Sequence, residues 1–191
     1  MAANTNNAQN VTSGKPYEGG AVFVAPLGST LPTTATEQLD AAFKNVGYIS
    51  EDGVTNSNAP TTENTKAWGG DIVLNTITEK ADTYGLTMLE VMNEDALKTV
   101  YGANNVSGDL ATGMTIHANS KELPELSFVI DMIYKGNVRK RVVIPDATAV
   151  LSGDITYADG SAVGLPVTLS AYPDSNGDTH LEYIKTISVS A

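Results

Sequence analysis

The segment 126–144 constrains the fold most, because only one strand pairing separates its apolar side chains from its charged ones. With a three-residue loop at 135–137, the residues opposite each other are Tyr134 and Val138, Ile130 and Val142, and Phe128 and Ile144. This register places the apolar side chains on one face, interrupted only by Lys140, and sets Asp131 opposite Arg141 on the other. A two-residue loop would scatter both kinds of side chain over both faces, so the sequence predicts an antiparallel hairpin with the longer loop.

Further short segments carry the β-branched residues and flanking turn residues that are typical of strands. They are residues 21–25, 71–79, 82–91, 154–157, 163–171 and 181–185. With the hairpin, these segments give eight or more short strands. We therefore predict a mainly β fold, a sandwich or barrel with one or two helices packed on it.

Two segments predict helices. In the first, Thr34 and Glu37 have the spacing of a capping box, and apolar residues follow at helical spacing up to residue 46. In the second, Asn93 is a suitable N-terminal cap, and residues 94–101 carry an apolar face before a glycine. Helices are thus expected over residues 34–46 and 93–101.

Two other segments are too poor in large apolar side chains to form a core. Residues 1–20 are rich in Asn, Ala and Gly, which predicts an arm that is disordered alone or ordered by a neighbour. The stretch 51–65 is almost entirely polar, and so long a polar connection is usually functional or unstructured. The rest of the chain, residues 21–191, is expected to form a single β domain.

The composition excludes several functions. Twenty-two acidic residues against 11 basic ones give a net charge of −11, which repels a phosphate backbone and argues against tight binding of nucleic acid. Cysteine is absent, which excludes disulfides, thiolate metal sites and cysteine nucleophiles. No basic leader and no apolar stretch of membrane-spanning length occurs, so we expect a protein made in the cytoplasm without a membrane anchor.

No motif for catalysis or cofactor binding is present, and neither an enzyme nor a cofactor is predicted. The segment 174–178 resembles a calcium loop, but its glycine is misplaced and Lys185 stands where a carboxylate is needed, so a turn is preferred. His117 and His180 lack the spacing of a metal site. The basic cluster 139–141 alternates along a strand, which favours a cross-strand ion pair over a phosphate site.

A set of segments spread over the chain carries a family resemblance. They are GAVFVAPLGSTLP at 20–32, LDAAF at 39–43, GYISEDGV at 47–54, KAW at 66–68, TMLE at 87–90, SFVID at 127–131 and GLPVTLSAYP at 164–173. In this order they resemble the major tail tube proteins of long-tailed, non-contractile bacteriophages, most closely those of actinobacterial phages. Some members carry an additional C-terminal immunoglobulin-like domain, for which this chain has no room, so the resemblance implies the minimal tube subunit.

The resemblance implies a β-sandwich with a flanking helix, which would be residues 93–101. Six copies are expected to form a ring whose inner strands join into one barrel around a channel, and rings are expected to stack into a tube. The implied partners are further copies of the chain, the tape measure protein, the tail terminator and distal tail proteins. DNA would pass through the channel without specific binding. The implied location is the virion tail, after assembly in the host cytoplasm.

By position, the resemblance implies that the polar stretch 51–68 is an assembly loop that reaches the next ring, with residues 1–20 as an arm. The candidate inter-ring residues are Glu51, Asp52, Gly53, Val54 and Trp68. Trp68 is either an interface anchor or part of the subunit's own core.

A channel lined by acidic residues would repel DNA, and six subunits of net charge −11 would carry about 66 excess negative charges. Candidate lining residues are Asp71, Glu79, Asp82 and Glu90, although strand alternation turns some of these side chains to the other face.

An alternative from another class is a monomeric β-sandwich binding module, such as a carbohydrate-binding or adhesin-like domain. The segment 159–167 supports it, because it is compatible with an immunoglobulin-like strand pair. Glycan-binding modules usually display aromatic platforms, however, and this chain has one Trp and 6% aromatic residues.

Overall fold

The hairpin predicted over residues 126–144 forms the centre of the fold. β10 (Leu126–Tyr134) pairs antiparallel with β11 (Val138–Leu151), and the observed partners are Tyr134 with Val138, Ile130 with Val142, Phe128 with Ile144 and Asp131 with Arg141. The predicted register and three-residue loop are confirmed. Gly136 and Asn137 close the loop with φ values of 81° and 59°, in the left-handed region that these two residue types tolerate best.

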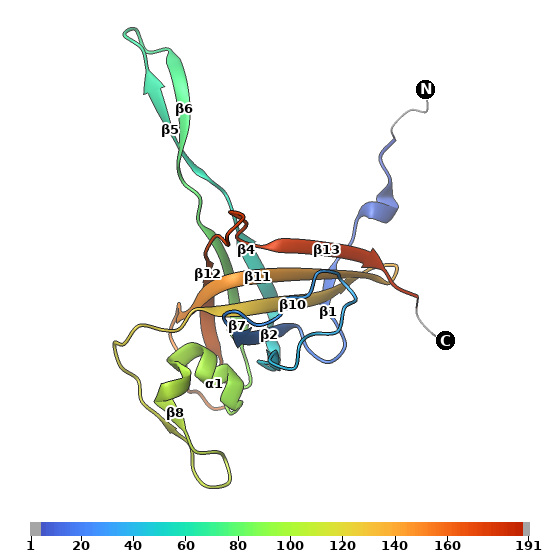
Figure 1. Cartoon of the computed structure of the whole chain (residues 1–191), viewed down its shortest axis with the longest axis vertical. Helices are drawn as coiled ribbons and strands as arrows, with labels where there is room; N and C mark the ends of the chain where they lie inside the picture. The colour runs from blue at the N-terminus through green and yellow to red at the C-terminus, as the bar shows by residue number, and fades with distance from the viewer. Residues whose placement is uncertain (1–4, 189–191) are drawn as a thin grey trace.

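A nine-stranded antiparallel sheet surrounds this hairpin in the computed structural model, which describes residues 5–188 (Figure 1). The strand order is β3-β2-β10-β11-β12-β7-β4, with β1 added on β10 and β13 on β11. The remaining strands of this sheet are β1 (Gly14–Pro16), β2 (Val22–Pro26), β3 (Lys44–Asn45), β4 (Ile49–Ser57), β7 (Asp82–Met88), β12 (Leu165–Ala171) and β13 (Leu181–Thr186). The fold is mainly β, as predicted, and the described strands do not close into a barrel.

Two small sheets lie outside the large one. β5 (Thr61–Lys66) pairs with β6 (Ile72–Glu79), and β8 (Val106–Ser107) pairs with β9 (Thr115–Ile116). Because β4 leads into β5 and β6 leads into β7, the β5–β6 ribbon continues the β4–β7 pair outward. Figure 1 shows it projecting from one end of the molecule, and we call residues 58–81 the arm.

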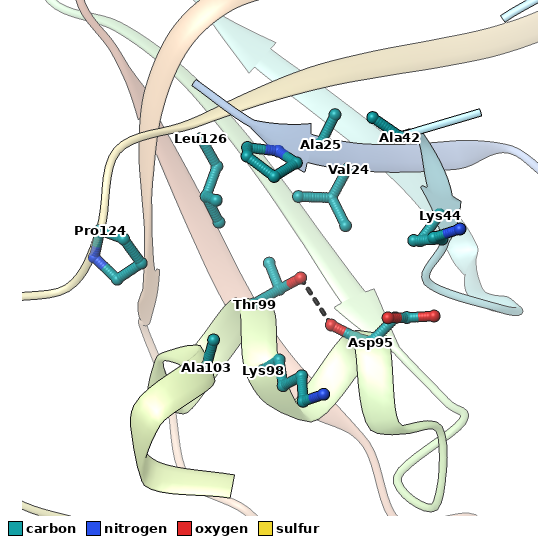
Figure 2. Close-up of a pocket in the computed structure, with 11 residues that line it drawn as sticks. Val24, Ala25, Ala42, Lys44, Asp95, Lys98, Thr99, Ala103, Pro124 and Leu126 are labelled. Carbon is teal, nitrogen blue, oxygen red and sulfur yellow. Dashed lines mark hydrogen bonds between the residues drawn. The ribbon is translucent and has the colours of Figure 1, made fainter. Parts of the chain in front are cut away.

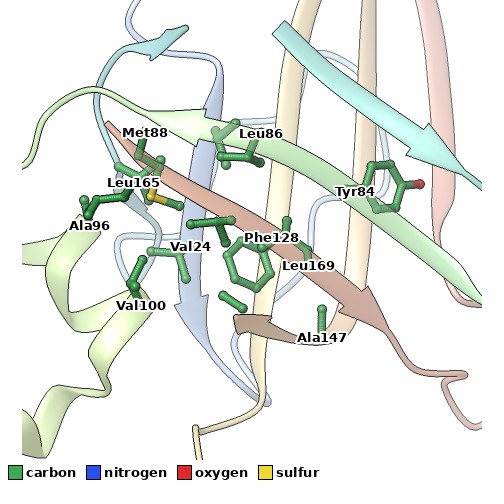
Figure 3. Packing of buried hydrophobic residues seen from close by; sticks show 14 of the residues in the cluster. Val24, Tyr84, Leu86, Met88, Ala96, Val100, Phe128, Ala147, Leu165 and Leu169 are labelled. Carbon is green, nitrogen blue, oxygen red and sulfur yellow. The ribbon is translucent and has the colours of Figure 1, made fainter. Parts of the chain in front are cut away.

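The main core lies between two parts of the bent sheet. Side chains of β7 and β12 pack against those of β2, β10 and β11, as Figure 3 shows for Leu86, Leu169 and Phe128. Burying each such side chain stabilises the fold by about 1.5–3 kcal/mol relative to leaving it exposed. The arrangement is consistent with a β-sandwich type of fold.

Helix α1 (Glu94–Tyr101) forms where it is predicted. The Asn93 side chain accepts hydrogen bonds from the backbone N–H groups of Asp95 and Ala96, and Gly102 ends the helix with a φ of 87°. Its buried face, which packs on the main core, comprises Ala96, Leu97 and Val100.

The basic cluster at 139–141 forms the predicted cross-strand ion pair. Arg141 binds Asp131 through two hydrogen bonds of 2.7 and 2.8 Å, and Arg139 adds a third of 2.7 Å. The side chains of Arg141 and Asp131 are only 1% and 2% exposed. The remaining guanidinium nitrogen of Arg141, Nη1, donates to the carbonyl oxygens of Thr34 and Glu37, at 3.1 and 2.7 Å.

The helix predicted over residues 34–46 is wrong, and these contacts give the reason. The carbonyl oxygens of Thr34 and Glu37 are turned toward Arg141, so they are not available for helical hydrogen bonds. The capping-box pair forms only a local turn, in which the Glu37 N–H donates to Thr34 Oγ1. The apolar residues do not share a face either, because Phe43 packs in a small second cluster while Val46 packs in the main core.

The segment 1–20, predicted to be a disordered or neighbour-ordered arm, is partly ordered by the subunit itself. β1 pairs with the end of β10, and the Arg139 guanidinium lies 3.8 Å from the centre of the Tyr17 ring. Residues 5–13 are exposed. The prediction is therefore corrected for residues 14–17, while residues 1–4 lie outside the described part of the chain.

The other strand predictions fit the structure with one exception. Segments 21–25, 71–79, 82–91, 163–171 and 181–185 correspond to β2, β6, β7, β12 and β13. The strand predicted at 154–157 is wrong, because this segment is irregular and places Ile155 against the main core from a connection.

Candidate assembly surfaces

The arm stands away from the body of the subunit. Every residue from 59 to 81 is exposed, and β5 and β6 pair only with each other. A lone two-stranded hairpin is marginally stable in water, because it has no third strand or helix to cover it. The arm therefore has the properties of a segment that is completed by another surface.

One strand of the arm is apolar. The β6 side chains that are exposed to between 56% and 63% are Ile72, Val73, Leu74 and Ile77. Trp68, at the tip, is fully exposed, at 107%. The alternative that Trp68 belongs to the subunit's own core is therefore wrong. Contiguous exposed apolar side chains mark interaction surfaces.

The stretch 51–68, predicted to be a polar loop, is mostly strand. It contains most of β4, all of β5 and the first residues of the tip. Its threonine-rich segments show no apolar alternation because the ribbon buries neither face against its own subunit, and the usual strand signal is therefore missing.

Glu51, Asp52, Gly53 and Val54 lie in β4, within the body of the subunit rather than on the arm. They occupy a bulged part of β4, where the pairing with β7 shifts between Ile49 and Val54. Together with β1 and β10 they line an open groove of about 880 Å³. The structure thus separates these four predicted residues from Trp68, which lies at the far tip.

Four strands of the large sheet have an unpaired edge in the described residues. β3 pairs only with β2, β4 only with β7, β1 only with β10, and β13 only with β11. The β13 edge is also partly apolar, with Ile184 59% exposed. Unpaired edges present free backbone N–H and C=O groups that can pair with another chain.

The four predicted lumen acids do not share one surface. Asp71 lies at the tip of the arm and Glu79 at its base, and both are exposed. Glu90 accepts hydrogen bonds from the Tyr48 backbone N–H and the Asn93 side chain, so it stabilises the entry to α1. The fourth acid, Asp82, lies inside the subunit.

Asp82 sits where the arm joins the sheet and is 1% exposed. Its carboxylate accepts hydrogen bonds from Asn56 Nδ2 (2.7 Å), Thr179 Oγ1 (2.6 Å) and His180 Nδ1 (2.5 Å). Because Asn56 belongs to β4 while the other two precede β13, the carboxylate ties both legs of the arm to the β12–β13 connection. Burial alone would raise the pKa of Asp82, but these hydrogen bonds outweigh it and hold the pKa below its ordinary value of 3.8.

Asp82→Asn is expected to lower the free energy of unfolding at pH 7 by about 1–3 kcal/mol, because donors in the cluster lose a charged acceptor. The depressed pKa means that the wild-type carboxylate stabilises the fold above its unfolded pKa and loses this contribution as the pH falls through its folded pKa. Urea unfolding should therefore show a difference between wild type and variant that shrinks below about pH 4. Glu63→Gln, on the exposed arm, is the control. A difference that stays constant into strong acid would contradict the role of the ionised carboxylate.

A smaller cleft of about 200 Å³ lies between α1 and the strands β2 and β10 (Figure 2). Its apolar lining comprises Val24, Ala25, Pro26, Ala42, Ala103, Pro124 and Leu126. The Thr99 hydroxyl donates to the Asp95 carbonyl oxygen at 2.7 Å, so its hydrogen is already used. Lys44 and Lys98 also line the cleft, and the whole suits an apolar or aromatic group better than a polar one. We call it the α1 cleft.

We next consider the side chains among the described residues that could bind a metal ion or act as acid or base. Among residues 5–188, no group of three or more His, Asp or Glu side chains could hold a metal ion. His180 is engaged with Asp82, and His117 is exposed. The segment 174–178 forms the predicted turn, with Asp174 accepting from backbone N–H groups of Asn176 and Asp178. In the same part of the chain, none of the helices has the length and apolar character needed to cross a membrane.

Sequence reasoning missed two of these surfaces. The consecutive apolar residues of β6 predict a strand, but without alternation they do not tell whether the strand is buried or exposed. The α1 cleft brings together residues from β2, α1 and the segment before β10, and no local pattern announces such a combination. An apolar strand beside a polar one, with tryptophan in the turn between them, is the signal that could have identified the arm.

A family model described as phage tail tube protein matches residues 1–189 of the chain. A search of curated proteins returned no match.

Proposed function

Because the chain belongs to the phage tail tube protein family, we propose that it is the major tail tube subunit of a long-tailed, non-contractile phage. Six copies close into a ring, and rings stack into a tube through which DNA leaves the particle. The family is a structural one, so the chain acts as a building block of the virion tail.

The exposed arm is the observation that carries this proposal. An isolated subunit leaves the apolar strand of the arm and Trp68 in water, whereas a stacked ring covers them. Each large apolar side chain that becomes buried contributes about 1.5–3 kcal/mol, and six arms act together between two rings. We therefore assign to the arm the role of the assembly loop that the family resemblance implies.

The unpaired strand edges support closure into a ring. β1, β10, β11 and β13 form a four-stranded part of the sheet with free edges on both sides. Pairing of these edges between neighbours would join the subunits into one shared barrel and remove the hazard of open edges. The sheet stays open in one subunit because its closing partner is the next copy.

The acidic balance suits a channel that conducts DNA. At −11 per subunit, a ring repels the phosphate backbone and offers it few places to bind. Asp71 and Glu79 remain candidates for exposed charge on the assembled tube. Asp82 is not part of this proposal, because its carboxylate is buried in its own subunit. The further partners are the tape measure protein inside the tube and the tail terminator and distal tail proteins at its ends, with assembly in the host cytoplasm.

Negative-stain electron microscopy of the purified protein at high concentration tests the proposal. Rings with a central hole, and tubes built from them, are the expected result, and sedimentation should show six subunits in the smallest closed species. A protein that remains monomeric at every concentration and binds a defined glycan would instead be a binding module.

A further inference from the structure

We propose that Trp68 of one subunit docks in the α1 cleft of a subunit in the next ring. This inference rests on the proposed stacking of rings and names the contact that joins them. It is based on two features of the same chain, the fully exposed side chain of Trp68 and the apolar α1 cleft.

The Trp68 side chain is not buried in its own subunit. It is the one Trp of the chain, and it lies at the arm's tip in the turn that Gly69 and Gly70 form with φ values of 115° and 101°. These values belong to the left-handed region, so the turn depends on glycine and presents the indole outward. Large aromatic side chains in this kind of position are the anchors that dominate interfaces when they enter a pocket.

The α1 cleft has the size and chemistry for an indole. Its volume is about 200 Å³, and an apolar cavity of roughly 150 Å³ is known to accept a benzene ring. Figure 2 shows Val24 and Leu126 on the sheet side and the helix on the other. Two lysines, Lys44 and Lys98, line the cleft against a single carboxylate, Asp95, so the lining should attract Asp71, which follows Trp68 closely in the chain.

The positions of arm and cleft favour a head-to-tail contact. Figure 1 shows the arm projecting from one end of the long axis and α1 near the opposite end. A strand rises about 3.3 Å per residue, so the leg from residue 58 to 67 reaches about 30 Å beyond the sheet. The tip therefore points away from its own α1 cleft and toward that of a copy stacked above. Such a contact does not close on itself, and its repetition builds an open tube.

The larger groove beside β4 is a poorer site for the same side chain. Its lining includes the carboxylates of Glu51, Asp52 and Glu90, which would lie near Asp71 of the incoming tip. Like charges brought together disfavour that complex. The groove is therefore the alternative binding site for Trp68 that the cross-linking experiment below compares with the α1 cleft.

The emission of Trp68 reports its environment without labelling, because the chain has no other Trp. In the wild-type protein, emission should move to shorter wavelength and acrylamide quenching should weaken when subunits are converted into tubes. Tubes in which Trp68 remains as quenchable as in the free subunit would overturn the inference and leave the proposed function intact.

Cross-linking locates the docked tip, and the absence of native cysteine makes it specific. Subunits carrying Ala67→Cys are co-assembled with subunits carrying Ala103→Cys, at the cleft, or Tyr48→Cys, at the groove, and treated with a short cysteine-reactive cross-linker. All three positions are exposed, so the substitutions leave the core unchanged. Dimers from the Ala103→Cys pair alone are expected. Dimers from the Tyr48→Cys pair alone would overturn the inference.

Blocking the cleft gives an independent readout. Ala103→Phe should raise the concentration needed for elongation roughly tenfold or more, as should Trp68→Ala, because either removes one anchor. The double variant should be no worse than either single one, because both remove the same contact. Asn104→Phe, at an exposed neighbour outside the cleft lining, should elongate normally. Additive effects in the double variant would overturn the inference, and wild-type protein that forms neither rings nor tubes would overturn the proposed function with it.

Discussion

Asp131→Ala is expected to lower the free energy of unfolding by about 3–5 kcal/mol, the largest effect of any single substitution considered. The substitution leaves the buried guanidinium of Arg141 without its counter-ion and removes three hydrogen bonds of 2.7–2.8 Å. Arg141 cannot turn to water, because its side chain is 1% exposed and its Nη1 is held by the carbonyl groups of Thr34 and Glu37. Equilibrium unfolding in urea, followed by circular dichroism, measures the change.

Asp159→Ala is the matched control, because it removes an exposed aspartate and should change the free energy of unfolding by less than about 0.5 kcal/mol. Replacing Asp131 and Arg141 together by Leu and Met should cost less than the sum of the two single substitutions, because no unpaired charge remains. A loss below about 1 kcal/mol for Asp131→Ala would show that water reaches the guanidinium and that the pair is not a buried one.

Replacing residues 59–80 by an Asn-Gly turn is expected to abolish elongation while leaving the subunit folded. The body should keep its stability, because residues 59–81 are exposed and the arm strands pair only with each other. The Asn-Gly sequence suits the short turn that would then close β4 onto β7. Electron microscopy and sedimentation should show rings or free subunits and no tubes, at concentrations where the wild type is fully assembled.

A second variant keeps the backbone of the arm and removes only its apolar side chains. Ile72→Thr, Leu74→Thr and Ile77→Thr together preserve strand propensity and should also prevent elongation. Met92→Thr with Leu110→Thr removes side chains of similar exposure, 67% and 66%, from outside the arm and should assemble normally. Full-length tubes from the armless protein would show that the arm is not the contact between rings.

Sequence patterns predicted correctly those elements whose structure depends on residues close together in the chain. The β10–β11 register follows from alternation that permits a single separation of apolar and charged side chains, and the pairing of Asp131 with Arg141 follows from that register. Helix α1 follows from its cap at Asn93 and its apolar face, which meets the core directly.

Sequence patterns did not predict the structure of segments whose conformation or burial depends on residues far away in the chain. The segment 34–46 has the spacing of a helix, but Arg141, more than 100 positions later, takes the carbonyl groups that a helix would need. The sequence makes Asp82 a candidate for the channel lining but does not decide its face, and residues 26 and about 98 positions away enclose its carboxylate. The arm gave no strand signal in its first leg because alternation reports burial, and this leg is not buried in the subunit.

The continuity of the arm with β4 and β7 has a mechanical consequence for a tail that flexes or is pulled. Tension applied at the tip runs along β7, whose ladder with β12 extends over seven residue pairs from Leu165 with Met88 to Ala171 with Asp82. The hydrogen bonds of such a ladder lie perpendicular to the strands, so a pull along the strand loads all of them in shear at once instead of unzipping them one after another. In the proposed tube, each subunit would thereby be held along the direction in which the tail is stretched.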